Sequence, residues 1–136
     1  MRIFILDDME ERHRAFRRTL MNHMLTHAYS FEEGCKLVSD SEKFDVFFLD
    51  HDLMDAHYTA YNGGYMSPQP FEYTGYHFVR WMIDDMPVEK RPELVVVHSW
   101  NDSGAARMAR DLEEAGFKVH VEEFHVNLGA NLKDNR

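Results

Sequence analysis

Three short apolar runs, each ended abruptly by acidic or histidine side chains, constrain the fold of this 136-residue chain more than any other feature. They lie at residues 3–6, 45–50 and 94–99. None of them alternates between apolar and polar residues, as a strand with one solvated face does. Each run therefore predicts a strand that is buried on both faces, which is typical of a parallel sheet covered by helices on both sides.

The segments between the apolar runs predict helices. Capping pairs stand at Asp8 and Glu11 and again at Ser30 and Glu33, and Thr74 precedes a third amphipathic stretch. We expect the first helix to turn these apolar side chains toward the sheet: Met9, Phe16, Leu20 and Met24.

The last part of the chain predicts one more helix and one more strand. Asp102 or Ser103 is expected to cap the helix, and Gly116 to end it. A loosely alternating stretch, residues 117–126, predicts the final strand. Because strands alternate with helices along the chain, we expect an α/β fold class.

Composition and length exclude several classes of protein. The chain suffices for a single domain over residues 1–136, but not for two cores. Its net charge of −9, from 24 acidic against 15 basic residues, argues against binding to duplex DNA, because phosphate neutralisation needs a basic surface. No apolar run approaches the roughly 20 residues of a membrane span. Cys35 is the only cysteine, which excludes a disulfide framework, predicts a buried structural thiol and favours a cytoplasmic location.

One long segment, residues 53–74, breaks the alternation of strands and helices. It holds four tyrosines, two prolines and a Gly-Gly pair, and shows no periodicity. A loop of this length in a compact domain is commonly functional. We expect an active-site insertion that closes over a ligand and involves Asp52, Asp55, His57 and Tyr61. The simpler interpretation is a solvated loop that its tyrosines anchor.

Acidic side chains follow two of the apolar runs, at the edge of the sheet where ligands bind in such folds. Asp7, Asp8 and Asp50 would share a small space there. Like charges at close range favour a bound cation, and carboxylate oxygens are the ligands that Mg²⁺ or Mn²⁺ prefers. The sequence therefore predicts a divalent metal site. The alternative is that Asp8 caps a helix and the other two are solvated strand ends.

Two histidines follow the same strand ends, His51 beside Asp52 and His98 beside Ser99. Two imidazoles that face one phosphate can act as general base and general acid, because imidazole titrates near neutral pH. We therefore expect His51, His98 and Asp50 to carry the chemistry. The alternative is two hydrogen-bonded core histidines at the starts of loops.

An anion site is expected at the start of the helix that follows the third run. Ser99, Asn101 and Ser103 would bind phosphate oxygens there, beside the free N–H groups of the helix. A plain helix cap is the alternative. One of His120 and His125 in the last strand could also reach the site, whereas three other histidines are expected on the surface: His13, His23 and His27.

Two groups of residues carry a resemblance to known proteins. Residues 3–8, Ile-Phe-Ile-Leu-Asp-Asp, with an Asp after the middle strand and a Ser after the fourth, resemble a response-regulator receiver domain. However, the last strand has no lysine where a receiver has one, and the two histidines have no place in phosphotransfer. Residues 48–53, Phe-Leu-Asp-His-Asp-Leu, with residues 97–101, Val-His-Ser-Trp-Asn, resemble instead the cyclic-phosphate-processing receiver-like family of bacteria and phages.

This resemblance implies a flavodoxin-like three-layer sandwich whose five-stranded parallel sheet has the order 2-1-3-4-5. It also implies a phosphoesterase, assisted by a metal, that hydrolyses a cyclic phosphodiester in a small-molecule cyclic nucleotide or at a 2′,3′-cyclic phosphate end of RNA. Two alternatives stay open. One is a non-enzymatic receiver-like domain in which Asp50 accepts phosphate, and the other is a phage-type protein that sequesters a cyclic nucleotide signal.

Overall fold

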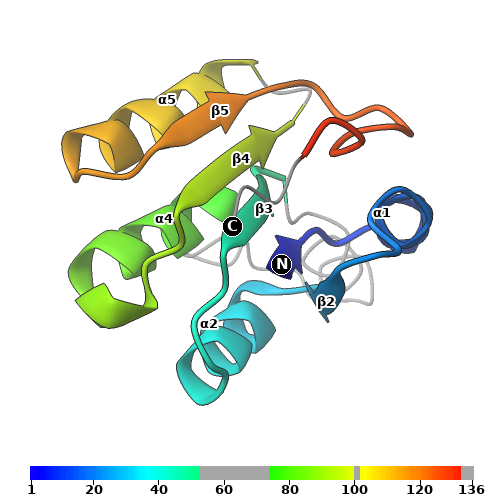
Figure 1. Ribbon diagram of the computed structural model, residues 1–136. Coiled ribbons are helices and arrows are strands. Elements are labelled where there is room, and N and C mark those ends of the chain that lie inside the picture. The colour runs from blue at the N-terminus through cyan, green and yellow to red at the C-terminus, as the bar shows by residue number, and fades with distance from the viewer. Residues whose placement is uncertain (53–73, 100–101, 133–136) are drawn as a thin grey trace, which may run out of the picture.

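Five parallel strands form one sheet in the computed structural model, which describes residues 1–52, 74–99 and 102–132 (Figure 1). The strands stand in the order β2-β1-β3-β4-β5. Their bounds are Arg2–Leu6 for β1, Met24–Ala28 for β2, Val46–Asp50 for β3, Leu94–His98 for β4 and Val119–Val121 for β5. The flavodoxin-like fold class and the strand order are therefore as predicted.

Helices cover both faces of the sheet. Within the described ranges they are α1 (Glu10–Thr19), α2 (Phe31–Asp40), α4 (Gly75–Asp84), α5 (Asp102–Glu114) and a short 3-10 helix, Val88–Lys90. Helices α2, α4 and α5 lie on one face, whereas α1 and the C-terminal segment, residues 122–132, lie on the other (Figure 1). None of these helices is both long and apolar enough to span a membrane.

The inner strands are apolar throughout because each of their faces contacts a layer. In β1, Ile3 and Ile5 pack with side chains of α1 and the C-terminal segment. Phe4 and Leu6 point the other way and pack with α2, α4 and α5. All four are fully buried. This two-sided burial is what the uninterrupted apolar runs of the sequence encode.

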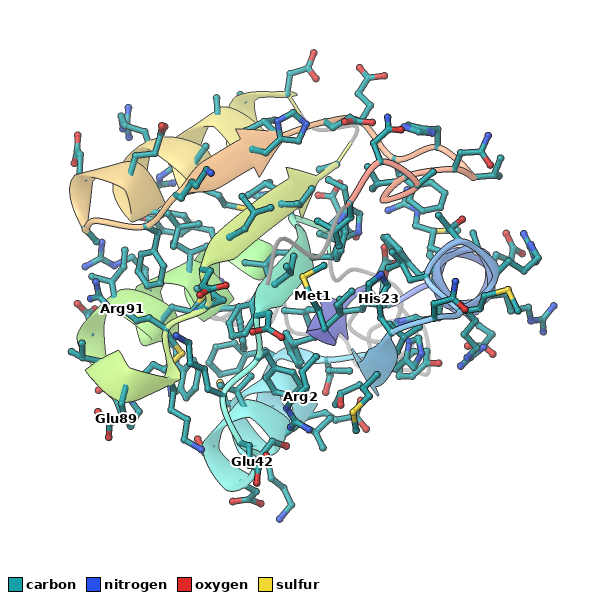
Figure 2. All side chains as sticks on the ribbon, viewed as in Figure 1. Met1, Arg2, His23, Glu42, Glu89 and Arg91 are labelled. Atoms are coloured by element: carbon teal, nitrogen blue, oxygen red, sulfur yellow. The ribbon has the colours of Figure 1, made fainter. Side chains whose placement is uncertain are left out.

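The first predicted helix is shorter than expected. Helix α1 ends at Thr19, and Met24, which we expected on its apolar side, begins β2 with 64% of its surface exposed. An edge strand has one uncovered side, so β2 lacks the continuous apolar pattern of the inner strands. The amino group of Met1 lies 3.0 Å from Nδ1 of His23 and ties the start of β1 to the residue before β2 (Figure 2).

Two of the predicted helix caps are confirmed. The side chain of Ser30 accepts a hydrogen bond from the N–H of Glu33 at the start of α2. Thr74 caps α4 and accepts the N–H of Tyr76. Within α2, Cys35 is half-buried rather than buried, and burial raises the pKa of its thiol to about 12, which makes the thiol unreactive at neutral pH.

The expected capping box of Asp8 and Glu11 is wrong. Met9 holds the cap position of α1 and makes no side-chain hydrogen bond to the helix. The carboxylate of Asp7 accepts the N–H of Met9 at 2.9 Å instead. The chain therefore enters α1 from a residue that is fixed at the end of β1.

The end of the chain differs from the expectation in two respects. Asp102 and Ser103 lie inside α5 rather than before it. Strand β5 covers only Val119–Val121, not the predicted residues 117–126, because the chain leaves the edge of the sheet after its pairing with β4. Gly116 does end α5, and its positive φ of 100° is a conformation that glycine adopts without strain.

Candidate active site

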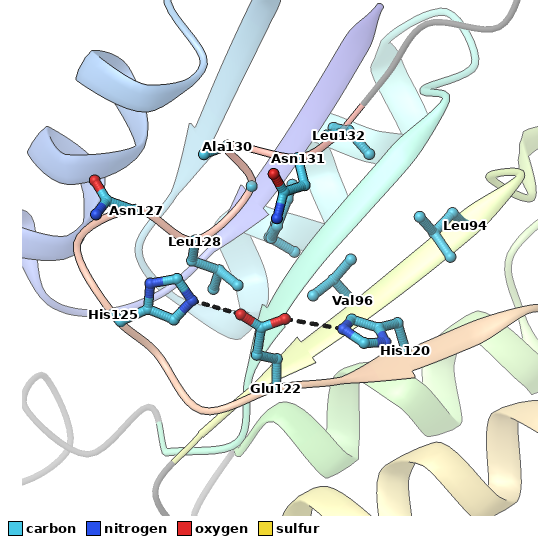
Figure 3. Close-up of a pocket in the computed structure, with 12 residues that line it drawn as sticks. Leu94, Val96, His120, Glu122, His125, Asn127, Leu128, Ala130, Asn131 and Leu132 are labelled. Atoms are coloured by element: carbon cyan, nitrogen blue, oxygen red, sulfur yellow. Dashed lines mark hydrogen bonds and ion pairs between the residues drawn. The ribbon is translucent and has the colours of Figure 1, made fainter.

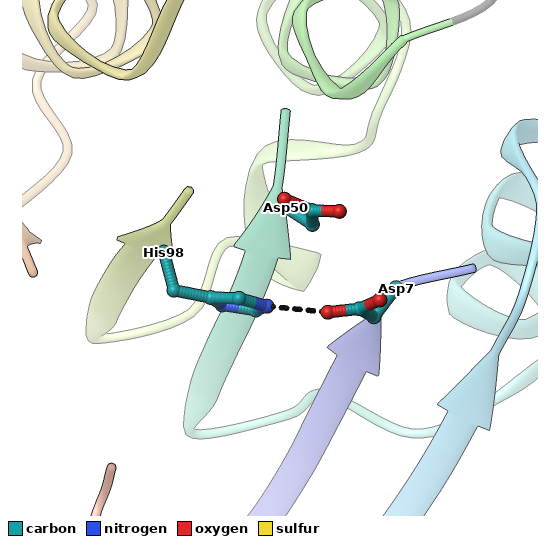
Figure 4. A group of neighbouring side chains, drawn as sticks. All are labelled: Asp7, Asp50 and His98. Carbon is teal, nitrogen blue, oxygen red and sulfur yellow. Dashed lines mark hydrogen bonds and ion pairs between the residues drawn. The ribbon is translucent and has the colours of Figure 1, made fainter. Parts of the chain in front are cut away.

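Three strand ends meet at the carboxyl edge of the sheet (Figure 4). Asp7 follows β1, Asp50 ends β3 and His98 ends β4, and the parallel register places Asp50 directly beside His98. One ligand atom from each side chain lies within 4.8 Å of the other two, and all three side chains are buried. The fold thus brings two carboxyl groups and an imidazole into one small buried space.

Asp7 is held at both of its carboxylate oxygens. Oδ1 accepts the N–H of Met9 at 2.9 Å, and Oδ2 accepts a hydrogen bond from Nε2 of His98 at 2.9 Å. Burial opposes ionisation, but the hydrogen bonds and the positive charge of Arg12 together hold the pKa of Asp7 below its ordinary value. Asp7 is therefore ionised at neutral pH.

Asp50 is in a different environment. Its Oδ1 is buried and accepts no hydrogen bond from the described residues, while Oδ2 lies 3.4 Å from Nη1 of Arg12. Burial and the negative charge of Asp7 raise the pKa of Asp50 to about 9, against the opposing charge of Arg12. A buried carboxyl group that has an unpartnered oxygen and lies beside a second carboxylate fits a hard divalent cation such as Mg²⁺ or Mn²⁺, which would stabilise the ionised form of both groups.

Arg12 is the member of the site that the sequence analysis missed. Nη1 lies 3.4 Å from an oxygen of Asp7 and 3.4 Å from an oxygen of Asp50, and the guanidinium lies over the ring of Phe124 at 5.0 Å. Arg12 stands one helical turn before Phe16, a residue that was expected to face the sheet. That spacing was the available signal, since residues four apart share one face of a helix.

The imidazole of His98 is enclosed by aromatic rings. Phe16, Phe48 and Phe124 lie around it at centroid distances of 5.3, 6.4 and 6.0 Å, and none of its surface is exposed. Burial lowers its pKa, against the opposing effect of Asp7. Nδ1 has no partner among the residues described. A neutral ring with its proton on Nε2 fits these facts, because a charged ring would bury an unpaired N–H.

A second group of polar side chains lies just after the ends of β3 and β4. Nδ1 of His51 lies 2.8 Å from Oδ1 of Asp52, and the hydroxyl of Ser99 donates to Oδ2 of Asp52 at 3.5 Å. The side chain of His51 keeps 18% of its surface exposed, whereas that of His98 keeps none. An imidazole that a carboxylate orients and that solvent can reach is suited to proton transfer.

A sequence profile of the cyclic-phosphate processing receiver domain matches residues 1–114. The chain belongs to this family. The resemblance seen in the sequence around the ends of β3 and β4 is thereby confirmed. No curated protein sequence matches the chain.

Solved receiver domains share the fold of this family member at low sequence identity. The CheY-like receiver domain from Methylobacillus flagellatus is 14% identical with a TM-score of 0.63, and the alignment covers 96% of this chain and 92% of that one. The response regulator TrrA from Thermotoga maritima is 14% identical with a TM-score of 0.61, at coverages of 93% and 90%. The receiver domain from Methanospirillum hungatei is 15% identical with a TM-score of 0.61, at 92% and 83%.

The other predicted site residues of this receiver-family chain are not part of the cluster of Asp7, Asp50 and His98, or lie outside the described residues. Asp8 is partly buried, and its negative charge contributes to the raised pKa of Asp50. Ser103 is exposed in the first turn of α5. The following lie outside the described ranges: Asn101, Asp55, His57, Tyr61 and all of the predicted insertion, residues 53–74, except Thr74, which caps α4.

His13 and His27, which we expected on the surface, instead form a hydrogen-bonded pair next to the backbone of Asp7, so that expectation is wrong. His13 is fully buried, and its Nε2 donates to the backbone oxygen of Asp7 at 2.7 Å. Its Nδ1 lies 2.6 Å from Nδ1 of His27 in β2, and Tyr29 covers its ring at 4.0 Å. Since Nε2 of His13 carries the proton, His27 donates to Nδ1 of His13. The pair fixes the backbone at Asp7.

This histidine pair predicts that the protein loses stability in acid. Burial and the neighbouring His13 lower the pKa of His27 from 6.5 to about 4, so the unfolded chain takes up a proton before the folded one does. The free energy of unfolding should fall by about 1–2 kcal/mol as the pH drops from about 6.5 to 4, after allowance for partial exposure. Denaturant unfolding at several pH values should show a shallower fall for His27→Gln, and an unchanged slope in this variant would contradict the assignment.

Proposed function

We propose that this chain hydrolyses a cyclic phosphodiester, in a cyclic nucleotide or at a 2′,3′-cyclic phosphate end, with the help of a divalent cation. The observation that carries the proposal is the buried Asp50, whose carboxyl group has one unpartnered oxygen and lies beside a second carboxylate. A cation bound there would reduce the cost of burying two ionised carboxylates side by side. Membership of a family described as processing cyclic phosphates supports the choice of substrate class.

In this proposal Asp7 and Asp50 hold the cation, with Asp8 beside them. When bound, the cation draws charge from the phosphoryl oxygens and so lowers the barrier to attack. The guanidinium of Arg12 contacts both carboxylates, and it would turn to a phosphate oxygen once the cation took its place. Ser99, whose hydroxyl contacts Asp52, would bind a further phosphate oxygen.

His51 moves the proton. It accepts a proton from the attacking water as the water oxygen bonds to phosphorus, and returns it to the ribose oxygen as the P–O ester bond breaks. One water molecule is consumed, and no other reactant is needed. His98 acts as a positioning residue through its hydrogen bond to Asp7, because its ring is fully buried. This assignment replaces the symmetrical histidine pair of our sequence-based hypothesis.

A non-enzymatic receiver-like phosphoacceptor is the second candidate. The TrrA receiver domain, whose fold is similar, was solved with Mg²⁺ and a beryllium fluoride group. Asp50, at the end of β3, would accept phosphate in such a domain. A protein that sequesters a cyclic nucleotide without cleaving it is the third. The three differ in what happens to the ligand, and one set of measurements separates them.

The first test incubates the protein with cyclic mono- and dinucleotides and with 2′,3′-cyclic phosphates, in Mn²⁺, Mg²⁺ or EDTA, followed by chromatography. Turnover that EDTA and Asp50→Asn both abolish is the expected result. Covalent labelling of Asp50 by acetyl phosphate without turnover would favour the phosphoacceptor instead. Depletion of free ligand without product would favour sequestration.

The role of His51 is tested through the glycine against which it packs. An added Cβ at Gly104 would lie 2.5 Å from Cδ2 and 2.6 Å from Nε2 of His51, so Gly104→Ala must displace the ring. We expect turnover to fall about tenfold or more, because the ring leaves the position that Asp52 sets. The free energy of unfolding should change by only about 1 kcal/mol, because the ring can turn toward solvent and alanine favours the helix.

A double-mutant cycle separates this effect from a general disturbance of α5. In a His51→Ala background, Gly104→Ala should have little further effect on turnover, because the displaced group is already absent. Additive losses in the double variant would show that Gly104→Ala acts through the helix rather than through His51.

A further inference from the structure

Three metal-ligating side chains gather outside the candidate active site, at the far edge of the sheet (Figure 3). They are His120 in β5, Glu122 directly after it and His125 in the C-terminal segment. Nε2 of His120 lies 2.9 Å from Oε1 of Glu122, and Nε2 of His125 lies 2.5 Å from Oε2 of the same carboxylate. All three lie beyond residues 1–114, the part of the chain that matches the family profile.

The backbone brings these side chains together. The N–H of Glu122 donates to the oxygen of Val97 at 3.0 Å, so the extended pairing with β4 continues one residue past β5. His120 and Glu122 are two residues apart on this extended chain and therefore point to the same side. A turn closed by the N–H of Leu128 and the oxygen of His125, at 2.9 Å, returns the third side chain toward them.

The C-terminal segment that carries His125 is anchored, although its polar side chains are not buried. Leu128 is only 3% exposed, and the hydroxyl of Thr19 donates to the backbone oxygen of Val126 at 3.0 Å. The side chains of His120, His125 and Glu122 keep 58%, 49% and 39% of their surface exposed. The two imidazoles lie on opposite sides of the Glu122 carboxylate, each on a different oxygen (Figure 3). Because all three side chains are partly exposed on fixed backbone positions, they can turn about their side-chain bonds and converge on one ion.

We propose that His120, Glu122 and His125 bind one transition-metal ion of the Zn²⁺ class. Two imidazole nitrogens and one carboxylate oxygen are the donor set that Zn²⁺ takes in sites with an open position, whereas the oxygen-rich Asp7 and Asp50 suit Mg²⁺ or Mn²⁺. A cavity of about 190 Å³ adjoins the three side chains and leaves room for water as the remaining ligand (Figure 3).

The ion would fasten the C-terminal segment to the edge strand. That segment contributes Phe124, whose ring packs against His98 at 6.0 Å and lies under the guanidinium of Arg12 at 5.0 Å. Binding at His120 and His125 therefore stabilises one wall of the candidate active site without contacting it. The proposal does not depend on what reaction, if any, takes place there.

Isothermal titration of the full chain with ZnCl₂, in excess Mg²⁺, tests the site. We expect one ion per chain, and a loss of affinity of about tenfold or more in each of His120→Gln, Glu122→Gln and His125→Gln. Zn²⁺ should also raise the unfolding temperature of the wild type but not that of the His120→Gln/His125→Gln double variant. Because these side chains are largely exposed, the variants should keep the wild-type circular dichroism spectrum.

Two matched controls make the assignment specific. Asp50→Asn removes a ligand of the active-site cation and should leave Zn²⁺ binding unchanged, as should His23→Gln, which removes an imidazole elsewhere on the molecule. Titration with Co²⁺ provides a visible spectrum that should appear in both controls and be absent from the double variant. Zn²⁺ affinity that survives the double variant, or that disappears with Asp50→Asn, would overturn the proposal.

Discussion

Replacing Asp50 by Asn is expected to make the metal-free protein more stable and, at the same time, inactive. Asp50 is buried beside Asp7, and burial together with that negative charge raises its pKa to about 9. Asn has the same shape and cannot ionise, so folding of the variant does not carry the cost of protonating this side chain. At pH 7 we expect the free energy of unfolding to rise by roughly 2–4 kcal/mol. Urea unfolding of the wild type and the variant in EDTA measures this difference.

The extra stability of Asp50→Asn should depend on pH, because the pKa of Asp50 is raised in the folded protein. The unfolded chain ionises Asp50 near its ordinary pKa of 3.8, whereas the folded protein keeps the proton up to about pH 9. Wild-type stability is therefore lost as the pH rises from about 4 toward 9, and the stability of Asp50→Asn is not lost by this route. The difference between the two proteins should be small near pH 4 and largest at alkaline pH.

A divalent cation should offset most or all of this difference in stability. At about a hundred times its Kd, Mg²⁺ or Mn²⁺ adds roughly 2.7 kcal/mol to a protein that binds it only when folded. The free energy of unfolding of the wild type should increase by this amount, whereas that of Asp50→Asn should not change. Turnover of the variant should fall by about a thousandfold or more. Asp40→Asn, an exposed carboxylate in α2, is the matched control and should behave as wild type. An equal response of Asp50→Asn to the cation would refute the metal site.

The sequence predicted what depends on two-sided burial and on local hydrogen bonding. Strands β1, β3 and β4 were predicted because a strand between two helical layers must be apolar throughout, and their ends located Asp7, Asp50 and His98. The rule that ligands sit at the carboxyl edge of a parallel sheet then predicted that these side chains converge. The caps at Ser30 and Thr74 were predictable for a local reason, because each acts within its own helical turn.

What the sequence did not predict depends on contacts between distant segments. Strand β2 has an open edge, so its burial pattern is mixed and no periodicity marks it. Because β2 was missed, the contact of His27 with His13 could not be expected, and both were assigned to the surface. Arg12 was missed for a different reason: a cation in the buried face of a helix makes sense only once the carboxylates that it contacts are known to lie there.

The sheet therefore holds a cluster of charges that a purely structural core would avoid. Asp7, Asp50 and Arg12 lie within hydrogen-bonding or ion-pair distance under a wall of aromatic rings, and the one positive side chain is shared by two acidic ones. Buried groups of like charge reduce stability unless they serve another purpose. Arg12 limits this cost through its contacts with both carboxyl groups. In the proposed mechanism, the same position would allow Arg12 to change partners when a cation and a phosphate bind.

Arg12→Ala is accordingly expected to have opposite effects on metal binding and on turnover. Without the guanidinium, Asp7 loses its only cationic side-chain partner among the described Arg and Lys residues, and the metal-free protein should lose about 3 kcal/mol of stability. A divalent cation no longer competes with Arg12, so its affinity should rise about tenfold. Turnover should nevertheless fall by about a hundredfold or more, because a charge that binds the phosphate in the transition state is gone.

Two further variants identify the cause of these changes. Arg12→Lys keeps the charge but loses the planar fork, so its cation affinity should stay near that of the wild type while its turnover lies between those of the wild type and Arg12→Ala. Arg14→Ala removes an exposed arginine from the same helix and should change neither quantity. Removal of a group that competes with the cation strengthens cation binding, whereas removal of a group that only supports the two carboxylates weakens it. Weaker cation binding by Arg12→Ala would therefore show that the guanidinium is a structural support rather than an exchangeable partner.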